Sequence, residues 1–589
     1  MDLSYDTGRS GLGGERRLFA ARLAVGLIQG LALYALYFAG EHGLWPRTQP
    51  AAFGALALAA GYAPVVVLAG AGRLSRRTLT VWTAVAAVVL ALMGWHDVDR
   101  RVLDSWTQPP FLSFPTLASG AAVLFIAHHL IVPAVRNRRR IAPYADYFDT
   151  AWKAGVQLAM SLAFTGAFWL LLHLGGSLFR VIGIDALGRL LGEAWFAIPV
   201  LSLAFATAVQ LTDVRDGLIR GVRTVALMLL SWLLPVIVVL AAGFLLALPF
   251  TGLEGLWGTR RATALVLSAA GTLIVLINTA YQDGRPDNLP PTALCWTVRA
   301  GGVLLVPLVG LAFWGLMLRI GQHGLTPDRI IALACALVGA VYAVGYLLAA
   351  VRRGEWMQPL ERTNLAAAVL SVGLILALFS PLLDPARLAV ADQVARLDRG
   401  AMKAAAFDYD FLRFDSGRAG RAALDRLARS DDAEVARLAK AAQADRSRYS
   451  RIPRPEKVDT EAAANVKIET LPQGAALPDS FKDQFPRLSP VLQGCTGDRA
   501  CVARALPPAE DGRQRLLVTA PGEAMLFRHD ENGEWNEWVK YTDDCNTNLD
   551  LIAAAREGRI ETRAARFPDL VINGRPLSAQ IGVTCPDDR

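Results

Sequence analysis

The chain has 589 residues, of which 53% are hydrophobic and only 19% are charged, and its mean hydropathy is +0.34. These values exclude a string of ordinary soluble domains and indicate a membrane protein. The formal net charge of +8 comes mostly from arginines in short loops between apolar runs, such as RNRRR at 136–140. No nucleic-acid recognition motif accompanies these arginines, so we expect no nucleic-acid partner and take the lipid bilayer as the surroundings of the chain.

Long apolar runs fill the first 380 residues. A membrane-spanning helix needs about 20 mostly apolar residues, and about 11 segments meet that requirement. The first run shows no clear cleavage site for a signal peptide, so we expect it to stay as an anchor. The predicted spans lie near residues 18–39, 51–70, 79–95, 114–135, 154–174, 194–211, 223–249, 261–281, 298–318, 328–350 and 364–380.

Arginines are more frequent in the loops on the side of the amino terminus than in the loops on the other side. Positively charged loops stay in the cytoplasm, so the amino terminus is expected there. With an odd number of spans, everything after Ser380 then lies outside the cytoplasm. The sequence thus predicts a multi-pass protein of a bacterial inner membrane with a periplasmic carboxyl-terminal region.

Four of the six cysteines lie late in the chain, at Cys495, Cys501, Cys545 and Cys585. Disulfides persist in oxidising compartments, so this distribution agrees with the exported tail that the arginines predict independently. The spacing favours pairs between Cys495 and Cys501 and between Cys545 and Cys585, although four cysteines allow three pairings and the sequence does not choose among them. Free thiols or a zinc site are the alternatives, but no CxxC pair is present.

The exported part divides by composition into three segments. Residues 381–450 carry apolar residues at three- and four-residue spacing and predict helices, with Asp431 and Glu434 offering a capping box. Residues 451–464 are polar, contain prolines and predict a linker. Residues 465–589 have strand-like runs with Asn-Gly hairpin signals at 532–533 and 573–574, and so predict a disulfide-stapled α+β domain. The predicted fold is an α-helical polytopic membrane domain (1–380) followed by these three segments.

Four sequence blocks follow one another in the chain: NTAYQDGRPDNLPP, LRIGQHGLTPDRII, AVRRGEWMQPLERTNLAA and FSPLLDPARLAVADQVARL. Their order and spacing resemble the bacterial integral-membrane family catalogued as domain of unknown function 4153. The resemblance covers most of the chain through about residue 440, and we expect it to include the tail. It implies a polytopic inner-membrane protein without an established activity, so it supports the class of protein and supplies no chemistry.

Two polar stretches provide the candidate membrane-cavity residues. Asn278, Tyr281 and Gln282 end the eighth predicted span, where amide side chains bond across helices or line a cavity; an ordered loop after a span is the alternative. In GLTPDR, Thr326 is placed as a helix N-cap and Asp328 in the first turn, so the stretch predicts a helix start. The N-terminus of that helix could also bind an anion.

Other polar groups have ordinary explanations. HDVDRR at 96–101 is a conceivable weak metal site, but the solvation of an outer loop accounts for it. His128, His129 and His173 lie in spans with almost no carboxylates, which favours structural or interfacial roles over a metal site or proton relay. Residues 176–196 mix apolar and charged side chains and predict an amphipathic helix on the outer face of the membrane.

The sequence carries no phosphate-binding loop, nucleophile elbow or zinc-protease motif. We therefore predict no cofactor, no metal and no catalytic residue, and favour a protein that is not an enzyme. The main hypothesis is a sensing or scaffolding protein whose periplasmic domain binds a protein or another envelope component. The alternative is a transporter or channel for a small solute, with its cavity near Asn278. A membrane enzyme that acts on lipid-linked substrates is a third hypothesis.

Overall fold

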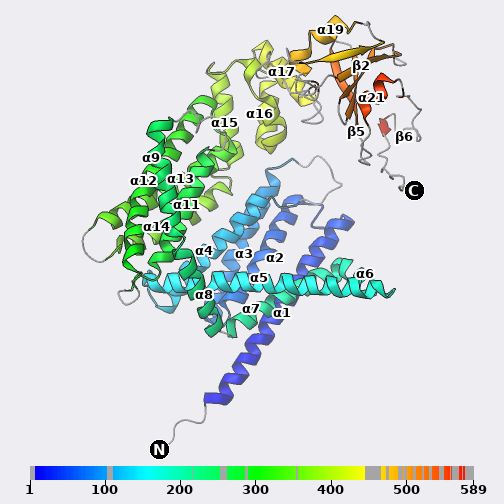
Figure 1. The fold of residues 1–589 in the computed structure, drawn as a ribbon. Coiled ribbons are helices and arrows are strands. Elements are labelled where there is room, and N and C mark those ends of the chain that lie inside the picture. Colours follow the sequence, from blue (N-terminus) through cyan, green and yellow to red (C-terminus); the bar gives the residue numbers. More distant parts are fainter. Residues whose placement is uncertain are drawn as a thin grey trace, which may run out of the picture. The chain divides into compact units, whose positions relative to one another are not determined.

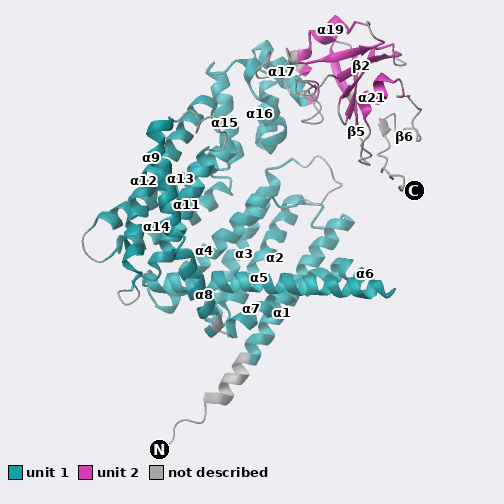
Figure 2. Ribbon diagram, viewed as in Figure 1, with its two compact units in different colours: residues 1–443 teal, residues 444–589 magenta. Residues whose placement is uncertain are grey.

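The computed structural model describes most of the chain, and the described residues form two compact units, 1–443 (unit 1) and 444–589 (unit 2) (Figure 2). The described residues are 7–102, 111–214, 216–252, 262–285, 289–352, 356–444, 466–472, 476–488, 492, 495, 501–508, 512–520, 523–529, 534–542, 550–557, 559, 570–572 and 575–577.

Among the described residues of unit 1, 11 helical segments are long and apolar enough to cross a membrane, which confirms the predicted fold class. One of the 11, Ile219–Thr251, covers most of α8 (Asp216–Ser231) and all of α9 (Leu234–Thr251). The helices are α1 (Thr7–His42), α2 (Pro50–Gly70), α3 (Arg76–Asp99), α4 (Phe114–Arg136), α5 (Tyr144–Val181), α6 (Ala186–Gly192), α7 (Ala194–Val214), α8 (Asp216–Ser231), α9 (Leu234–Thr251), α11 (Ala262–Tyr281), α12 (Thr292–His323), α13 (Pro327–Val351) and α14 (Pro359–Leu378).

These helices pack as two groups (Figure 1). In the first group, α1–α7, helix α2 packs along α3 and α1 packs along α7. In the second group, α8–α14, helix α12 lies between α11 and α13, and α14 packs on α13. The groups meet where α14 contacts α4 and where α5 contacts α8. Each group is built around an apolar core, and the two cores join at this seam, where the end of α14 packs on the first core and Tyr144 of α5 on the second.

Local sequence explains the element boundaries and the closest packing. Ser75 and Ser113 accept hydrogen bonds from backbone N–H groups in the first turns of α3 and α4, as N-caps do. Gly54 of α2 and Gly94 of α3 face each other so closely that an added Cβ would lie 2.6 and 2.3 Å, respectively, from the other residue's carbonyl oxygen. Small residues therefore permit the tight α2–α3 contact, as is common between helices in membranes.

Helix α5 differs from its prediction. The sequence predicts a span at 154–174 and a separate amphipathic helix at 176–196, but α5 runs continuously over Tyr144–Val181 and only the short α6 follows. The prediction of one interfacial helix at 176–196 is therefore wrong. The charged residues of this stretch favour an amphipathic helix, but Arg180 and Asp185 instead form an exposed ion pair across the turn that ends α5.

A helical array follows the last span and belongs to unit 1. Its apolar side chains, among them Val394, Leu412, Leu424 and Leu438, form a common core. Asp432 accepts the backbone hydrogen bonds at the start of α17, so the N-cap is Asp432 and the predicted capping box of Asp431 with Glu434 is wrong. The array consists of α15 (Pro385–Asp398), the short 3-10 and π helices η2 (Ala404–Ala406) and η3 (Phe411–Asp415), α16 (Gly417–Leu427) and α17 (Ala433–Ala444).

Unit 2 is built on a five-stranded sheet in the order β1-β2-β3-β4-β5, in which β1 and β2 are parallel and the other neighbours antiparallel. One core contains Phe481, Phe527 and Trp535 in edge-to-face contacts, and the short helix α21 packs on β2 and β3. The elements are β1 (Ile468–Leu471), α19 (Asp479–Lys482), α20 (Phe485–Leu488), β2 (Cys501–Leu506), β3 (Arg515–Ala520), β4 (Glu523–His529), β5 (Trp535–Thr542), α21 (Leu551–Arg556), β6 (Leu570–Ile572) and β7 (Arg575–Leu577).

The α+β prediction for this region is confirmed, and one predicted disulfide is present. Cys495 and Cys501 are bonded and fully buried in the core of unit 2. Cys545 and Cys585 lie outside the described residues, so their pairing stays a prediction. The strands on either side of each Asn-Gly signal pair antiparallel, β4 with β5 and β6 with β7, although both dipeptides also lie outside the described residues.

Candidate functional site

The polar residues of unit 1 gather at its two ends. At one end, the Tyr144 end, α5 and α14 begin while α11 and α13 finish. At the other end, the Asp384 end, α3 finishes, α12 turns into α13 and α14 runs into α15. The chain passes from one end to the other with each span, so the two sets of polar residues are separated by the apolar lengths of the helices.

At the Tyr144 end, four side chains from four helices form a closed hydrogen-bond network. The amide nitrogen of Asn364 (α14) donates to Tyr144 Oη (α5) at 2.9 Å and to Asn278 Oδ1 (α11) at 2.6 Å. The amide nitrogen of Asn278 donates to Tyr346 Oη (α13) at 2.7 Å, and Tyr346 in turn donates to Asn364 Oδ1 at 2.7 Å. Because Tyr144 belongs to the first group and the other three to the second, this network ties the two groups together.

Tyr281 extends the network toward the end of the unit. Its hydroxyl donates to Glu361 Oε1 at 3.0 Å, and its ring stacks on Trp356. Gly284 lies against both, because an added Cβ would come within 2.6 Å of Tyr281 Oη and 2.7 Å of Glu361 Oε1, and its φ of +71° also suits glycine. The stretch NTAYQDGR therefore folds against the start of α14, which explains why polar residues and a glycine end this span.

A buried ion-pair network lies among the helices of the first group. Arg22 of α1 is 1% exposed and donates to Gln210 Oε1 at 2.6 Å and to Asp213 Oδ2 at 2.7 Å. Arg73, in the turn before α3, donates to Asp213 Oδ1 at 2.6 Å and to Gln157 Oε1 at 3.3 Å. One carboxylate is thus shared by two guanidinium groups, an arrangement in which the carboxylate's hydrogen bonds offset the cost of burying charge.

This network corrects an expectation. The sequence predicts almost no carboxylates in the spans, yet α7 extends past the predicted end at residue 211 and includes Asp213, which pairs with Arg22 across 191 residues of sequence. An arginine inside an apolar run needs a polar partner at the same depth of the membrane. Arg22 lies inside the first apolar run, and Gln210 and Asp213 lie one turn apart at the end of another apolar run, so these residues are the signal that could have predicted the network.

The three span histidines have protein partners. His128 accepts from Trp82 Nε1 at 3.1 Å, and His129 Nδ1 lies 2.6 Å from the carbonyl oxygen of Phe125. His173 packs edge-on against Trp169. In the described part of the chain, no group of three or more His, Cys, Asp or Glu side chains is placed to hold a metal ion.

At the Asp384 end, the array is fastened to the first group. His96 Nε2 of α3 lies 2.9 Å from Asp384 Oδ2, with both side chains buried, and the same carboxylate caps α15 by accepting from the N–H groups of Ala386 and Arg387. The carbonyl oxygen of Arg100 accepts from the N–H of Arg418 at 2.9 Å, at the start of α16. Two residues of the array, Asp384 and Arg418, are therefore both hydrogen-bonded to the end of α3.

The environment of Asp384 stabilises its charged form. Burial raises the pKa of a carboxyl group, but here the hydrogen bond from His96, the backbone hydrogen bond of Arg387 and the charge of Arg100 outweigh burial and hold the pKa of Asp384 below its ordinary value. The carboxylate is thus charged at neutral pH, as a helix cap and an acceptor from His96 require.

The array is also fastened to the second group. Asp392 Oδ2 of α15 accepts from the N–H of Leu325 at 2.7 Å, in the turn between α12 and α13. Gln393 donates to the carbonyl oxygens of His323 and Leu325, and Arg396 donates to those of Gly321 and Gln322. These side chains satisfy the carbonyl groups that the end of α12 leaves without helical partners. We call the contacts of Asp384, Asp392, Gln393, Arg396 and Arg418 the clamp.

HDVDRR, predicted as an outer loop, is instead the last turn of α3 and the residues after it. Asp97 is 1% exposed, accepts from the N–H and hydroxyl of Ser113 at 2.8 and 2.7 Å, and pairs with Arg100 and Arg101. It therefore fixes the start of α4. The loop interpretation is wrong because the two acidic groups have partners elsewhere in the sequence. Asp97 accepts from Ser113, and Asp99 pairs with Arg418.

The structure separates the predicted cavity residues. Asn278 and Tyr281 lie in the network at the Tyr144 end, where the N–H of Gln282 donates to the carbonyl oxygen of Asn278. Thr326 lies at the opposite end, where it caps α13 by accepting from the N–H of Arg329, and Asp328 is exposed in the first turn of that helix. The predicted helix start at GLTPDR is confirmed. The two stretches do not share one cavity.

Comparison with known proteins gives one match. Residues 52–427 match the family model described as "Domain of unknown function (DUF4153)". No curated protein and no solved structure matches the chain. The matched residues include α15 and α16 and stop before unit 2. The expected extension of the resemblance into the tail is therefore not part of the match.

Proposed function

The chain belongs to the family of domain of unknown function 4153, and from that premise we propose that it is a membrane-embedded scaffold whose unit 2 binds a partner and whose clamp passes that binding event to the spans. In this proposal the membrane is a bacterial inner membrane and unit 2 lies in the periplasm. The partner is a protein or another component of the cell envelope.

The clamp is the observation that carries this proposal. Between the last span and unit 2, the chain forms an array that is hydrogen-bonded to α3 of the first group and to the α12–α13 turn of the second. A passive tether needs no such contacts, because a simple linker would connect unit 2 equally well. An element that holds two packed bodies at once can shift their relative position when it is pulled or stabilised, which is what a coupling device requires.

Two further observations support the proposal, one on unit 2 and one on the array. Its buried Cys495–Cys501 disulfide suits an oxidising compartment, whereas Cys295 and Cys335 in the spans are free thiols. The family match extends through α16, so the array up to the end of α16 is part of the domain that defines the family.

The first experiment is site-specific photocrosslinking in the native host with the full chain. A photoreactive residue at Tyr541 or Lys482, both exposed on unit 2, should give a discrete adduct with an envelope component. The matched control is the exposed Arg285 at the Tyr144 end, which should give no such adduct. If all three positions give the same adducts, or neither unit 2 position gives any, partner binding by unit 2 is wrong.

A transporter is the second candidate, because one observation favours it. The Asn278–Asn364–Tyr144 hydrogen bonds lie at the seam between the two groups, where relative movement would open a polar path. Asn278→Cys tests this in the membrane-embedded protein. Modification by soluble thiol reagents from one side or both would support a water-accessible path, and protection from both sides would remove this candidate. Cys295→Ser and Cys335→Ser remove the two free thiols found among the described residues.

A further inference from the structure

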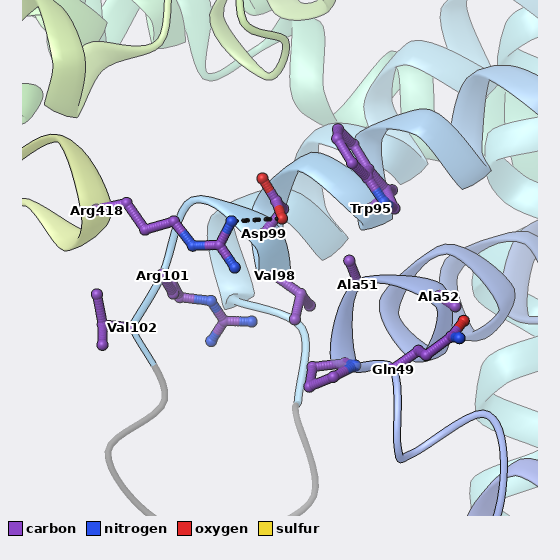
Figure 3. Close-up of a pocket in the computed structure, with 10 residues that line it drawn as sticks. Gln49, Ala51, Ala52, Trp95, Val98, Asp99, Arg101, Val102 and Arg418 are labelled. Atoms are coloured by element: carbon purple, nitrogen blue, oxygen red, sulfur yellow. Dashed lines mark hydrogen bonds and ion pairs between the residues drawn. The ribbon is translucent and has the colours of Figure 1, made fainter.

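A hollow of about 420 Å³ opens at the Asp384 end, between the start of α2, the end of α3 and the start of α16 (Figure 3). Its wall includes Gln49 and Ala51 of the first element, Trp95 and Asp99 of the second, and Arg418 of the third. Arg101, just beyond α3, completes it. The hollow shares Arg418 with the clamp but includes no residue of unit 2, so ligand binding there does not depend on partner binding by unit 2.

Two guanidinium groups from distant parts of the chain face this hollow (Figure 3). Arg101 is held in place by the carbonyl oxygens of Asp97 and Phe111. Arg418 places Nη1 2.8 Å from Asp99 Oδ1, while its side chain remains 63% exposed. The guanidinium groups are therefore oriented by the protein, as a site for an anion requires.

Among the described residues around the hollow, the charges sum to a positive value. Arg100, Arg101 and Arg418 face the two carboxylates of Asp97 and Asp99, which leaves an excess of one positive charge. Asp97 is 1% exposed, bonds to Ser113, Arg100 and Arg101 within the protein and does not line the hollow, so it does not face a ligand there. Asp99 is the one carboxylate among the described residues that line the hollow, and a bound anion would meet it.

The start of α2 adds donors to the same wall. Gln49 occupies the N-cap position without a side-chain hydrogen bond, and a proline follows it. In such a helix the N–H groups of Ala51 and Ala52 have no partner within the helix, and the helix dipole favours negative charge beside them. The uncapped start strengthens a site that the hollow and the two arginines already define.

Trp95 indicates that the hollow lies near the boundary between membrane and water. It lies four residues before the end of α3 and is 44% exposed, and tryptophan rings concentrate where a membrane meets water. A ligand with a charged head and an apolar body would set its head among the arginines and its body along this ring.

We propose that the hollow binds a phosphate-bearing anion, supplied either by the headgroup of an anionic phospholipid or by a free phosphate compound. Guanidinium groups match phosphate oxygens in geometry and charge. Because Arg418 belongs to the array and Arg101 follows a span, the bound phosphate bridges the array and the first group. Occupancy then stiffens the attachment of the array, in addition to the contact between His96 and Asp384.

The test uses the full chain in nanodiscs and counts retained lipid by native mass spectrometry. Wild-type protein should retain phosphatidylglycerol in preference to phosphatidylcholine, and Arg418→Gln should weaken that retention about tenfold or more, the usual effect of losing one charge-assisted hydrogen bond. Arg399→Gln, an exposed arginine elsewhere on the array, is the matched control and should change nothing.

A second variant keeps both arginines and fills the space. Ala51→Phe should also abolish retention, and Asp99→Asn should strengthen it because the competing carboxylate is gone. Inorganic phosphate, added over a concentration series, distinguishes the sources. Arg418-dependent competition by phosphate indicates a soluble ligand, and retention that phosphate leaves unchanged indicates the lipid. If neither lipid retention nor phosphate binding depends on Arg418, and Ala51→Phe has no effect on either, the inference is overturned.

Discussion

The two ends of unit 1 join the same two groups of helices by different means. At the Tyr144 end the groups touch directly, through Tyr144 on one side and Asn278 and Asn364 on the other. At the Asp384 end the array hydrogen-bonds to each group, through Asp384 on one side and Asp392 on the other, beside an apolar contact of the end of α14 with the core of the first group. The Asp384 end therefore has a second link between the groups, and that link belongs to an element that continues toward unit 2.

This difference suggests a division of roles. A buried network with matched donors and acceptors favours one arrangement, because any displacement leaves polar groups without partners in an apolar medium. The clamp instead uses side chains that donate to backbone carbonyl oxygens at the helix ends. Several of these contacts are exposed, so breaking any one of them costs less free energy. The Tyr144 end is expected to act as the pivot and the Asp384 end as the part that moves.

The largest effect is expected from Asp213→Asn, which removes the carboxylate shared by Arg22 and Arg73. Leaving buried guanidinium charge unpaired should cost about 3–5 kcal/mol of unfolding free energy, measured by titration from mild detergent into a denaturing one. Asp185→Asn, which breaks an exposed pair with Arg180, is the control and should cost less than about 1 kcal/mol. Equal losses in the two variants would show that the buried network is not a fixed part of the first group.

Asn364→Leu should have the next largest effect. It removes the donor to Tyr144 and Asn278 and the acceptor for Tyr346, and three hydrogen bonds between membrane helices are worth about 2 kcal/mol together. The same titration measures it, with Gln322→Leu, an exposed side chain at the other end, as control. A variant as stable as wild type would mean that the Tyr144 end is not the pivot.

The pH dependence of stability, compared between wild-type protein and Asp384→Asn, tests the role of the Asp384 end. The folded-state pKa of Asp384 lies below the ordinary value of 3.8, so its contribution is complete above that value and is lost as the pH falls through the folded-state pKa. Wild-type protein should therefore lose stability on acidification below about pH 4, and the variant should start about 1 kcal/mol less stable and lose less over the same range. Parallel pH profiles would contradict the assigned role of the carboxylate.

The smallest effect is expected from Arg396→Gln, which removes a charged donor to the carbonyl oxygens of Gly321 and Gln322. Because these contacts are exposed, the loss should stay below about 1 kcal/mol. Hydrogen exchange should nevertheless quicken at the N–H of Leu325 and leave the amides around Asn278 unchanged. Equal acceleration at both ends would show that the clamp and the network are one cooperative structure.

Sequence reasoning found what is local and missed what is distant. The spans follow from continuous apolar runs, and the start of α13 follows from Thr326 and the proline after it, because neither signal needs a distant partner. The contacts of His96 with Asp384 and of Arg22 with Asp213 join residues 288 and 191 positions apart. No local pattern encodes such pairs, so the sequence predicts His96 as a loop residue and gives no local signal of either partnership.

The candidate site shows the same limit. Asn278 and Tyr281 were singled out because amides and hydroxyls at the end of a span need partners, but those partners, Asn364 and Glu361, lie on a helix that begins about 80 residues later. The length of α5 was underestimated for a related reason. Its first turns, around Asp146 and Asp149, are polar, and Asp149 is paired with Arg223 of another helix.

The most direct test of the account is the side of the membrane on which unit 2 lies. Two reporters fused after Arg589, one active only after export and one fluorescent only in the cytoplasm, measure this in the same host. The account predicts activity of the exported reporter and no fluorescence of the other, which would place the clamp and unit 2 together on the exported face. A fluorescent cytoplasmic fusion without exported activity would contradict it, and with it the proposal that unit 2 binds an envelope partner.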